Sequence, residues 1–177
     1  MDLRIVKTRN AILSAWETLR AKKPVEKISV KELSELAQIN KATFYLHFHD
    51  IYDLSDYWER RMIEQVLVTL PPPEVFLADP AAAVITLAQA FLQKSSLLEM
   101  LYPHNTGDGL AEKLEEGILH YLSDSRPDWA DNEQAMITLR FCIYGGFYAF
   151  VRNGGRDPRQ VTQALCKIAI RLVPLLQ

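Results

Sequence analysis

The amino-acid sequence predicts an all-α protein with an N-terminal three-helix domain, residues 1–50, and a C-terminal helical domain, residues 51–177. Three observations support this prediction. Apolar residues recur at the three- and four-residue spacing of an α-helix through most of the chain. Glycine and proline fall mainly between these periodic segments. The alternating β-branched runs and Asn-Gly turns that indicate β-hairpins are missing.

The first helix is expected over residues 3–22, and Pro24 ends it because proline has no backbone N–H to donate within a helix. An apolar stripe at helical spacing predicts its buried face. The members of this stripe are Ile5, Ile12, Leu13, Trp16 and Leu19.

The second helix is expected to begin at Ser29 with a capping box. Ser29 can accept a hydrogen bond from the amide of Glu32, and the Glu32 side chain can reach back to the amide of Ser29. The buried face of this helix is predicted at Val30, Leu33, Leu36 and Ala37.

The third and fourth helices also carry N-cap residues. Asn40 caps a helix that is expected to end near Phe48. Asp50 caps the next helix, which should run to about Thr69, and Asp53 adds a negative charge at its N-terminal end. The small core shared with the first two helices is expected to contain Ile39, Phe44 and Phe48.

Within the second domain the helical pattern breaks at residues 71–73, which are three prolines. Asp79 and Pro80 then suit an N-cap and a first helical position, and the helix that follows should reach Leu92. A short helical piece over residues 95–101, a loop over 102–108 and a helix over 109–123 are expected next.

The last two helices are the longest apolar ones. Asp131, with Gln134 three residues later, predicts the start of a helix that runs to Asn153, where Gly154 and Gly155 give a C-cap signal. Residues 157–158 (Asp-Pro) open the final helix, which contains Val161, Leu165, Ile168, Ala169, Leu172 and Leu176.

Composition excludes several classes of protein. Residues 1–50 hold nine basic and six acidic side chains, whereas the remainder holds 11 and 16, so a basic head precedes an acidic body. Cys142 and Cys166 are too few for a disulfide framework or a zinc site, and a reduced cytoplasmic setting is expected. We see no signal peptide and no apolar run long enough to span a membrane.

The helix from Asn40 to Phe48 carries the chemistry of a DNA-recognition helix. Lys41 can donate to guanine, and Ala42 can contact a thymine methyl group. The hydroxyl and ring N–H groups nearby suit phosphate oxygens, which set register without reading sequence. The predicted DNA-binding residues are Ser29, Lys41, Ala42, Thr43, Tyr45, Leu46, His47 and His49.

Residues 28–54 resemble the DNA-binding head of TetR/AcrR-type transcriptional regulators. The resemblance rests on a capped helix, a turn and the pattern Thr-x-Tyr-x-x-Phe, which is matched by residues 43–48. Residues 141–163, with an aromatic-rich Tyr-Gly-Gly-Phe segment, resemble the C-terminal domain of a subset of this family. Family members often carry a lysine just inside the fourth helix, where this chain has Ile51.

The resemblance implies a helix-turn-helix domain, a ligand-binding and dimerisation domain, and a homodimer that pairs through its last two helices. A two-fold dimer should bind a palindromic double-stranded DNA operator, with half-sites about one helical turn apart or somewhat more. It also implies a repressor that a small-molecule effector releases. Candidate pocket residues are Trp58, Met62, Phe91, Met100, Tyr102, Tyr121, Phe141 and Tyr144, all of which also suit ordinary core packing.

Other interpretations stay open. Recognisable enzyme motifs are missing, so we expect no catalytic residue, no metal site and no cofactor. His104 and His120 would add polarity to a pocket, and the two cysteines are either a redox pair or inert buried thiols. The main alternative function is a helical dimeric protein-interaction module with a degenerate DNA-binding head.

Overall fold

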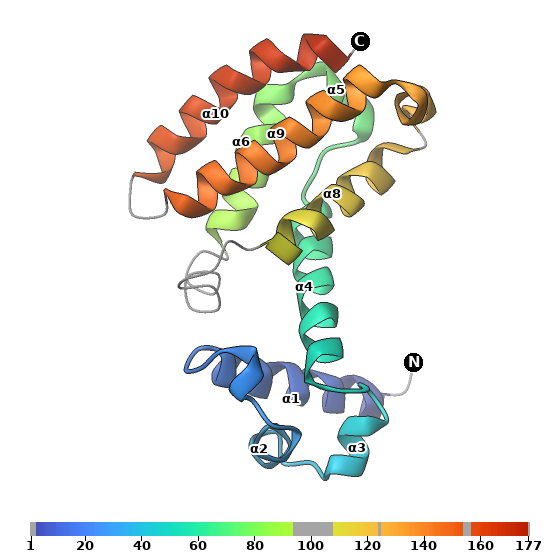
Figure 1. Ribbon diagram of the computed structural model, residues 1–177, viewed down its shortest axis with the longest axis vertical. Coiled ribbons are helices and arrows are strands. Elements are labelled where there is room, and N and C mark those ends of the chain that lie inside the picture. The colour runs from blue at the N-terminus through green and yellow to red at the C-terminus, as the bar shows by residue number, and fades with distance from the viewer. Residues whose placement is uncertain (1–2, 94–107, 124, 154–156, 177) are drawn as a thin grey trace. The chain divides into compact units, whose positions relative to one another are not determined.

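The computed structural model describes residues 3–93, 108–123, 125–153 and 157–176, and it confirms the all-α prediction. Within these ranges there is no β-strand. The helices form two compact units (Figure 1). We call residues 3–61 the head and the described residues from Met62 onward the body. The predicted functional boundary after residue 50 remains a prediction.

The head is built on four helical segments. They are α1 (Leu3–Arg20), α2 (Val30–Leu36), α3 (Lys41–Tyr45) and the first part of α4 (Ile51–Leu67), with a short 3₁₀ turn η1 (Val25–Lys27) between α1 and α2. Helix α2 packs against both α1 and α3. Each of the four helices contributes a large side chain to the fully buried core, which contains Ile12, Trp16, Leu33, Phe44 and Leu54.

The predicted N-caps of the head are confirmed. Ser29 Oγ accepts from the amide of Glu32 at 3.2 Å, and Asn40 Oδ1 accepts from the amide of Thr43 at 2.6 Å. Asp50 Oδ1 accepts from the amides of Tyr52 and Asp53, each at 2.8 Å. These bonds are local, so sequence spacing is enough to predict them.

The reciprocal half of the predicted capping box is wrong. The Glu32 carboxylate pairs with the ammonium group of Lys23, not with the amide of Ser29. Lys23 lies in the turn that follows α1, so this ion pair joins that turn to the first turn of α2.

Some predicted burial and helix ends in the head are also wrong. Ile5 and Leu36 are exposed, because the core of the head begins at Ile12 on α1 and the buried residues of the α2 segment are Leu33, Ser34 and Ala37. Helix α1 ends at Arg20 and α3 ends at Tyr45, short of the predicted residues 22 and 48.

The turn between α2 and α3 has a left-handed residue. Gln38 has φ 56°, a region that glycine adopts more easily than other residues. The amide of Ile39 donates to the carbonyl of Ser34 at 3.0 Å, and the amide of Gln38 donates to the carbonyl of Glu35 at 3.2 Å. This pair of bonds is a Schellman motif, which ends α2 and redirects the chain into α3.

Helix α4 contributes to both units. In the head, Trp58 Nε1 donates to Glu17 Oε1 of α1 at 2.9 Å. In the body, Leu67 and Ile63 lie next to Gly117 of α8. The helix ends at Leu67, slightly before the predicted Thr69.

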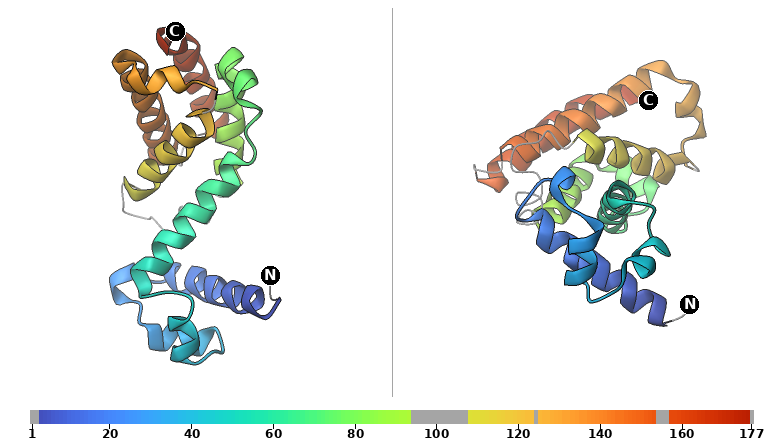
Figure 2. Two further views of the ribbon diagram at one scale, coloured as in Figure 1. Left: turned by 90° about the vertical axis from the view of Figure 1, so that its right-hand side faces the viewer. Right: turned by 60° about the horizontal axis from the view of Figure 1, so that its bottom comes forward.

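The described part of the body contains five α-helices and two 3₁₀ turns. They are α5 (Pro73–Ala78), α6 (Pro80–Leu92), α8 (Asp108–Ser123), α9 (Glu133–Arg152) and α10 (Pro158–Leu172), with 3₁₀ turns η2 (Pro127–Asp131) and η3 (Val173–Leu176). Helices α9 and α10 run side by side and antiparallel, and α10 also packs on α6 (Figures 1 and 2). Helix α8 packs against α9.

The body confirms one predicted cap, corrects another and adds a short helix that was not predicted. Asp79 Oδ1 accepts from the amide of Ala82 at 3.0 Å, with Pro80 at the first helical position. Helix α9 is capped by Asn132, not by Asp131, since Asn132 Oδ1 accepts from the amide of Ala135 at 3.0 Å. The three-proline break is followed directly by α5, because proline at a first helical position has no N–H that the helix needs.

Several predicted features lie outside the described residues. These are the short helix at 95–101, most of the loop at 102–108 and the glycine C-cap at 154–155. Among the helices that are described, none combines the length and the apolar character that a membrane crossing requires.

Candidate functional site

Helix α3 is anchored to the head through its aromatic side. Phe44 is 0% exposed, and its ring lies 5.8 Å from the ring of Phe48. Phe48 in turn packs edge-on against Tyr57 of α4, with ring centroids 5.4 Å apart. A helix this short does not hold itself in place, so this aromatic packing fixes its orientation.

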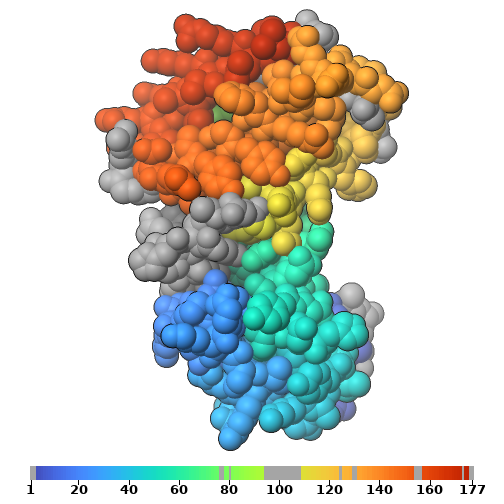
Figure 3. Space-filling model, viewed as in Figure 1, coloured from blue at the N-terminus to red at the C-terminus, as the bar shows by residue number. Residues whose placement is uncertain are grey.

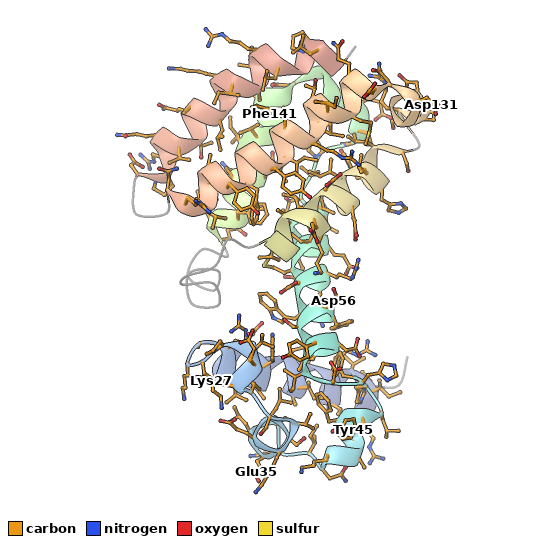
Figure 4. The ribbon with its side chains drawn as sticks, viewed as in Figure 1. Lys27, Glu35, Tyr45, Asp56, Asp131 and Phe141 are labelled. Atoms are coloured by element: carbon orange, nitrogen blue, oxygen red, sulfur yellow. The ribbon has the colours of Figure 1, made fainter. Side chains whose placement is uncertain are left out.

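The opposite side of α3 is open to solvent. Lys41 and Ala42 are exposed in its first turn. Tyr45, which is labelled in Figure 4, is 57% exposed. Leu46, the C-cap residue, is 83% exposed. An ammonium group, a methyl group and a phenol hydroxyl are therefore presented together on one short helix. These are the group types that contact base edges and phosphates in a major groove.

Two of the other predicted DNA contacts already take part in the caps. Ser29 is exposed, and its Oγ accepts the capping bond of α2. Thr43 Oγ1 donates to Asn40 Oδ1 at 2.8 Å, so its hydroxyl proton is occupied while its lone pairs remain available.

His47 and His49 lie just after α3 and differ in environment. Burial, and then the charge of Arg9, lower the pKa of His47 from its ordinary value of 6.5. The imidazole of His47 is therefore mainly neutral at pH 7 and offers one N–H donor. His49 is exposed, and its backbone amide donates to Asp53 Oδ2 at 2.8 Å.

Ile51 is buried at the start of α4. TetR/AcrR-type regulators, which the head resembles, often carry a lysine at this position. In this chain the Ile51 side chain belongs to the core of the head instead. A phosphate contact from this position is not available, so any such contact must come from other residues.

The body contains a cavity of about 350 Å³ that is partly open to solvent. Its walls come from α6, α8, α9 and α10, and they include Ala88, Leu114, Phe147 and Leu165. In Figure 3, green atoms of α6 are visible through a gap between α9 and α10. This gap lies on one side of the cavity. The cavity therefore lies within the bundle and reaches toward the face formed by α9 and α10.

The cavity wall is apolar throughout. Every side chain that lines it is aliphatic or aromatic, or is a glycine, apart from the thiol of Cys142. Phe91 of α6 contributes a ring that packs edge-on against Phe147, with centroids 5.8 Å apart. Burial raises the pKa of the Cys142 thiol, so this group is also uncharged at neutral pH. A cavity of this composition favours contact with hydrocarbon.

Only part of the predicted pocket lies in this cavity. Phe91 and Phe141 line it, whereas Trp58, Met62, Tyr121 and Tyr144 do not. Met100 and Tyr102 lie outside the described residues.

The two tyrosines that miss the cavity hold other parts of the body together. Tyr121 donates its hydroxyl to the carbonyl of Pro71. Tyr144 donates to Glu115 Oε2 at 2.8 Å, and Arg140 Nε donates to Glu115 Oε1 at 2.7 Å. The hydrogen bond to Glu115 is the main reason that the pKa of Tyr144 rises to about 12. This cluster therefore joins α8 to α9.

Sequence reasoning missed one feature of the cavity region. Gly145 and Gly146 line the cavity in the middle of α9, and a Cβ atom built on either would meet nothing within 4 Å. Their position inside a long apolar helix was the available signal. Exposed large apolar side chains also lie on the last two helices, where the sequence predicts the pairing of subunits; they include Ile137 and Phe141 of α9 and Ile168 of α10.

No protein-family model matches the sequence, and no curated protein matches it either.

Proposed function

We propose that this chain is a sequence-specific DNA-binding transcriptional regulator of the TetR/AcrR type. In this proposal it acts in the cytoplasm as a homodimeric repressor, and a small-molecule effector releases it from its operator. The supporting observations come from two places, the exposed side of α3 in the head and the α9–α10 face with its cavity in the body.

The observation that carries the proposal is the two-sided character of α3. Phe44 is fully buried on one side, while Lys41, Ala42, Tyr45 and Leu46 are exposed on the other. Exposed apolar groups beside a lysine, on a helix that a preceding helix and turn hold rigidly, fit a major-groove contact. A solvent-facing helix with no partner would more commonly carry charged and polar groups there.

The exposed apolar face of α9 and α10 supports the homodimer. Phe141 is 64% exposed and Ile168 is 49% exposed, and both lie on helices that already pack together. Large apolar side chains gathered on one face commonly mark a protein interface. Because a two-fold interface uses the same patch on both subunits, a second copy of this chain is its expected partner.

The first experiment is selection of bound sequences from a random double-stranded DNA pool with the purified protein. We expect a palindrome, and we expect Lys41→Ala and Tyr45→Ala to lose it. Lys27→Ala is the matched control, since it removes the same charge from an exposed lysine of the head that lies on η1 instead of α3. Tyr45→Phe separates the phenol hydroxyl from the ring.

A folded dimer that selects no sequence, or equal loss of binding in Lys41→Ala and Lys27→Ala, contradicts the proposed role of α3. The second candidate function is then a dimeric protein-interaction module. It is favoured by the burial of Ile51, which removes a phosphate contact, and by the apolar α9–α10 face.

Salt dependence discriminates between the two candidates. For operator binding, the logarithm of the association constant should fall linearly with the logarithm of the salt concentration. The slope should be about −0.9 for each phosphate contacted. A partner held by apolar anchors should show little dependence on salt.

A further inference from the structure

We propose that the 350 Å³ cavity of the body binds an uncharged, mainly apolar molecule of about two aromatic rings. The inference names the chemical class of the effector, and its regulatory meaning rests on the proposed function. The binding itself does not depend on DNA recognition, so it can be tested separately.

The lining of the cavity sets the charge of the ligand. Among the described residues that form it, none carries a charged, amide or hydroxyl side chain. A buried carboxylate or ammonium group of a ligand would lose its water without gaining an ionic partner, and this is strongly unfavourable. An uncharged ligand avoids this cost and gains from the burial of its apolar surface.

The volume sets the size of the ligand. An engineered cavity of about 150 Å³, lined by aliphatic and phenylalanine side chains, stays dry and binds benzene. The cavity in the body, at about 350 Å³, is more than twice as large. A naphthalene ring with a short substituent therefore suits it in size, and Phe91 and Phe147 supply aromatic contacts.

Gly145 and Gly146 indicate that space on this part of α9 is retained. Glycine in a helix interior is less favourable than alanine. No neighbouring atom within 4 Å excludes a methyl group at either position, so packing within the described chain does not explain the two glycines. Both glycines line the cavity, Gly145 with an exposed backbone and Gly146 half-buried, so the missing side chains leave room for a bound molecule chiefly beside Gly146.

The position of the cavity gives the ligand a route to regulation. Phe141 and Ile168 line the cavity and are also exposed on the α9–α10 face. A ligand that contacts them from inside alters the surface that the second copy is proposed to contact. Binding of the ligand and pairing of the subunits are therefore expected to be linked.

The test is calorimetric titration of the purified full-length protein with methyl 2-naphthoate and with the 2-naphthoate anion at pH 7.5. These two molecules share their ring system and differ mainly in charge. We expect the ester to bind and the anion to bind about a hundredfold or more weakly. Equal affinity for the two, or no binding of the ester by the folded protein, overturns the proposal.

Two variants at one position locate the binding site. Gly146→Phe projects a ring into the open space and should weaken ester binding about tenfold or more. Gly146→Ala adds one methyl group and is the matched control, which should keep most of the affinity. If Gly146→Phe unfolds, Ala88→Leu on the facing wall replaces it, with Ala78→Leu outside the cavity as its control. Unchanged affinity in a folded cavity variant overturns the assignment.

A sedimentation dilution series with and without the ester tests the link to pairing. We expect the ester to change the dimer dissociation constant, and an unchanged constant overturns the regulatory part. Ester binding that is confined to the monomer also overturns the proposal, because side chains of the second copy then fill the space. Failure of DNA selection with intact ester binding removes the proposed function alone, whereas DNA selection without ester binding removes only this inference.

Discussion

Replacement of Gly145 and Gly146 by alanine is expected to stabilise the body. Both residues lie within α9, far from either end of that helix. A Cβ at each position meets nothing within 4 Å, so the new methyl groups cause no clash within the described chain. The change therefore isolates the helix propensity of the two residues.

The expected gain follows from this geometry. Alanine is about 1 kcal/mol more favourable than glycine in a helix interior, so the double variant should gain about 2 kcal/mol. For a protein of this length, each substitution should raise the Tm by roughly 2–4 °C. The gain should appear in the transition of the body, because α9 belongs to that unit.

Gly117→Ala is the matched control. Gly117 also lies inside a helix, α8, but its Cβ would come within 2.3 Å of Leu67 Cδ1. The same propensity gain is then offset by displacement of the Leu67 side chain, so the net change should be close to zero or negative. A contrast between the two sites would show that open space, and not glycine itself, decides the result.

The assay is urea unfolding followed by circular dichroism over a range of protein concentrations. The concentration series separates folding from subunit pairing, which a methyl group on an exposed face also affects. A gain below about 0.5 kcal/mol for the double variant, or an equal gain at Gly117, would refute the reasoning. A small gain for the double variant would mean that the glycines meet a steric requirement within the chain. An equal gain for Gly117→Ala would mean that the Leu67 side chain moves aside without a measurable cost.

Three further predictions concern the head. Because Gln38 has φ 56°, Gln38→Gly should stabilise the head by roughly 1 kcal/mol, whereas Gln38→Val should destabilise it by at least as much. Urea titrations of the two variants should therefore give changes in the free energy of unfolding of opposite sign. Asn40→Ala should cost about 1 kcal/mol through loss of the α3 cap, while Asn10→Ala, at an exposed position within α1, should change little. His47 has a pKa lowered below 6.5, so the folded state binds its proton less tightly than the unfolded state, and the free energy of unfolding should fall as the pH drops below that value. His47→Gln should flatten this part of the pH profile, and an unchanged profile would assign the acid sensitivity to other groups.

The helix caps were predictable because the chemistry that forms them is local. Asn40 and Asp50 each accept from amides two or three residues away, and spacing alone specifies these bonds. The one error of this kind, Asp131 in place of Asn132, is a shift between adjacent residues that both suit an N-cap. The residue that becomes the N-cap is the one that the preceding 3₁₀ turn leaves in an extended conformation.

Burial and the cavity were less predictable because they depend on partners distant in sequence. Leu36 has the spacing of a core residue, yet it is exposed, whereas its neighbour Ala37 is buried. Trp58 and Tyr144 were predicted to line a pocket, but Glu17 and Glu115 accept hydrogen bonds from them instead. Periodicity shows that a helix has an apolar side, and it does not show which part of that side encloses empty space.

The free thiol of Cys142 lies in the wall of the cavity, where burial raises its pKa. A raised pKa leaves little thiolate at neutral pH, so generic alkylating reagents should react with it slowly. Small disulfide-forming fragments that first occupy the cavity gain a high local concentration beside the sulfur, and this favours exchange at that one site. The chain thus contains a native attachment point from which the shape of cavity occupants can be explored covalently, one fragment at a time, with Cys166 as an internal reference for labelling outside the cavity wall.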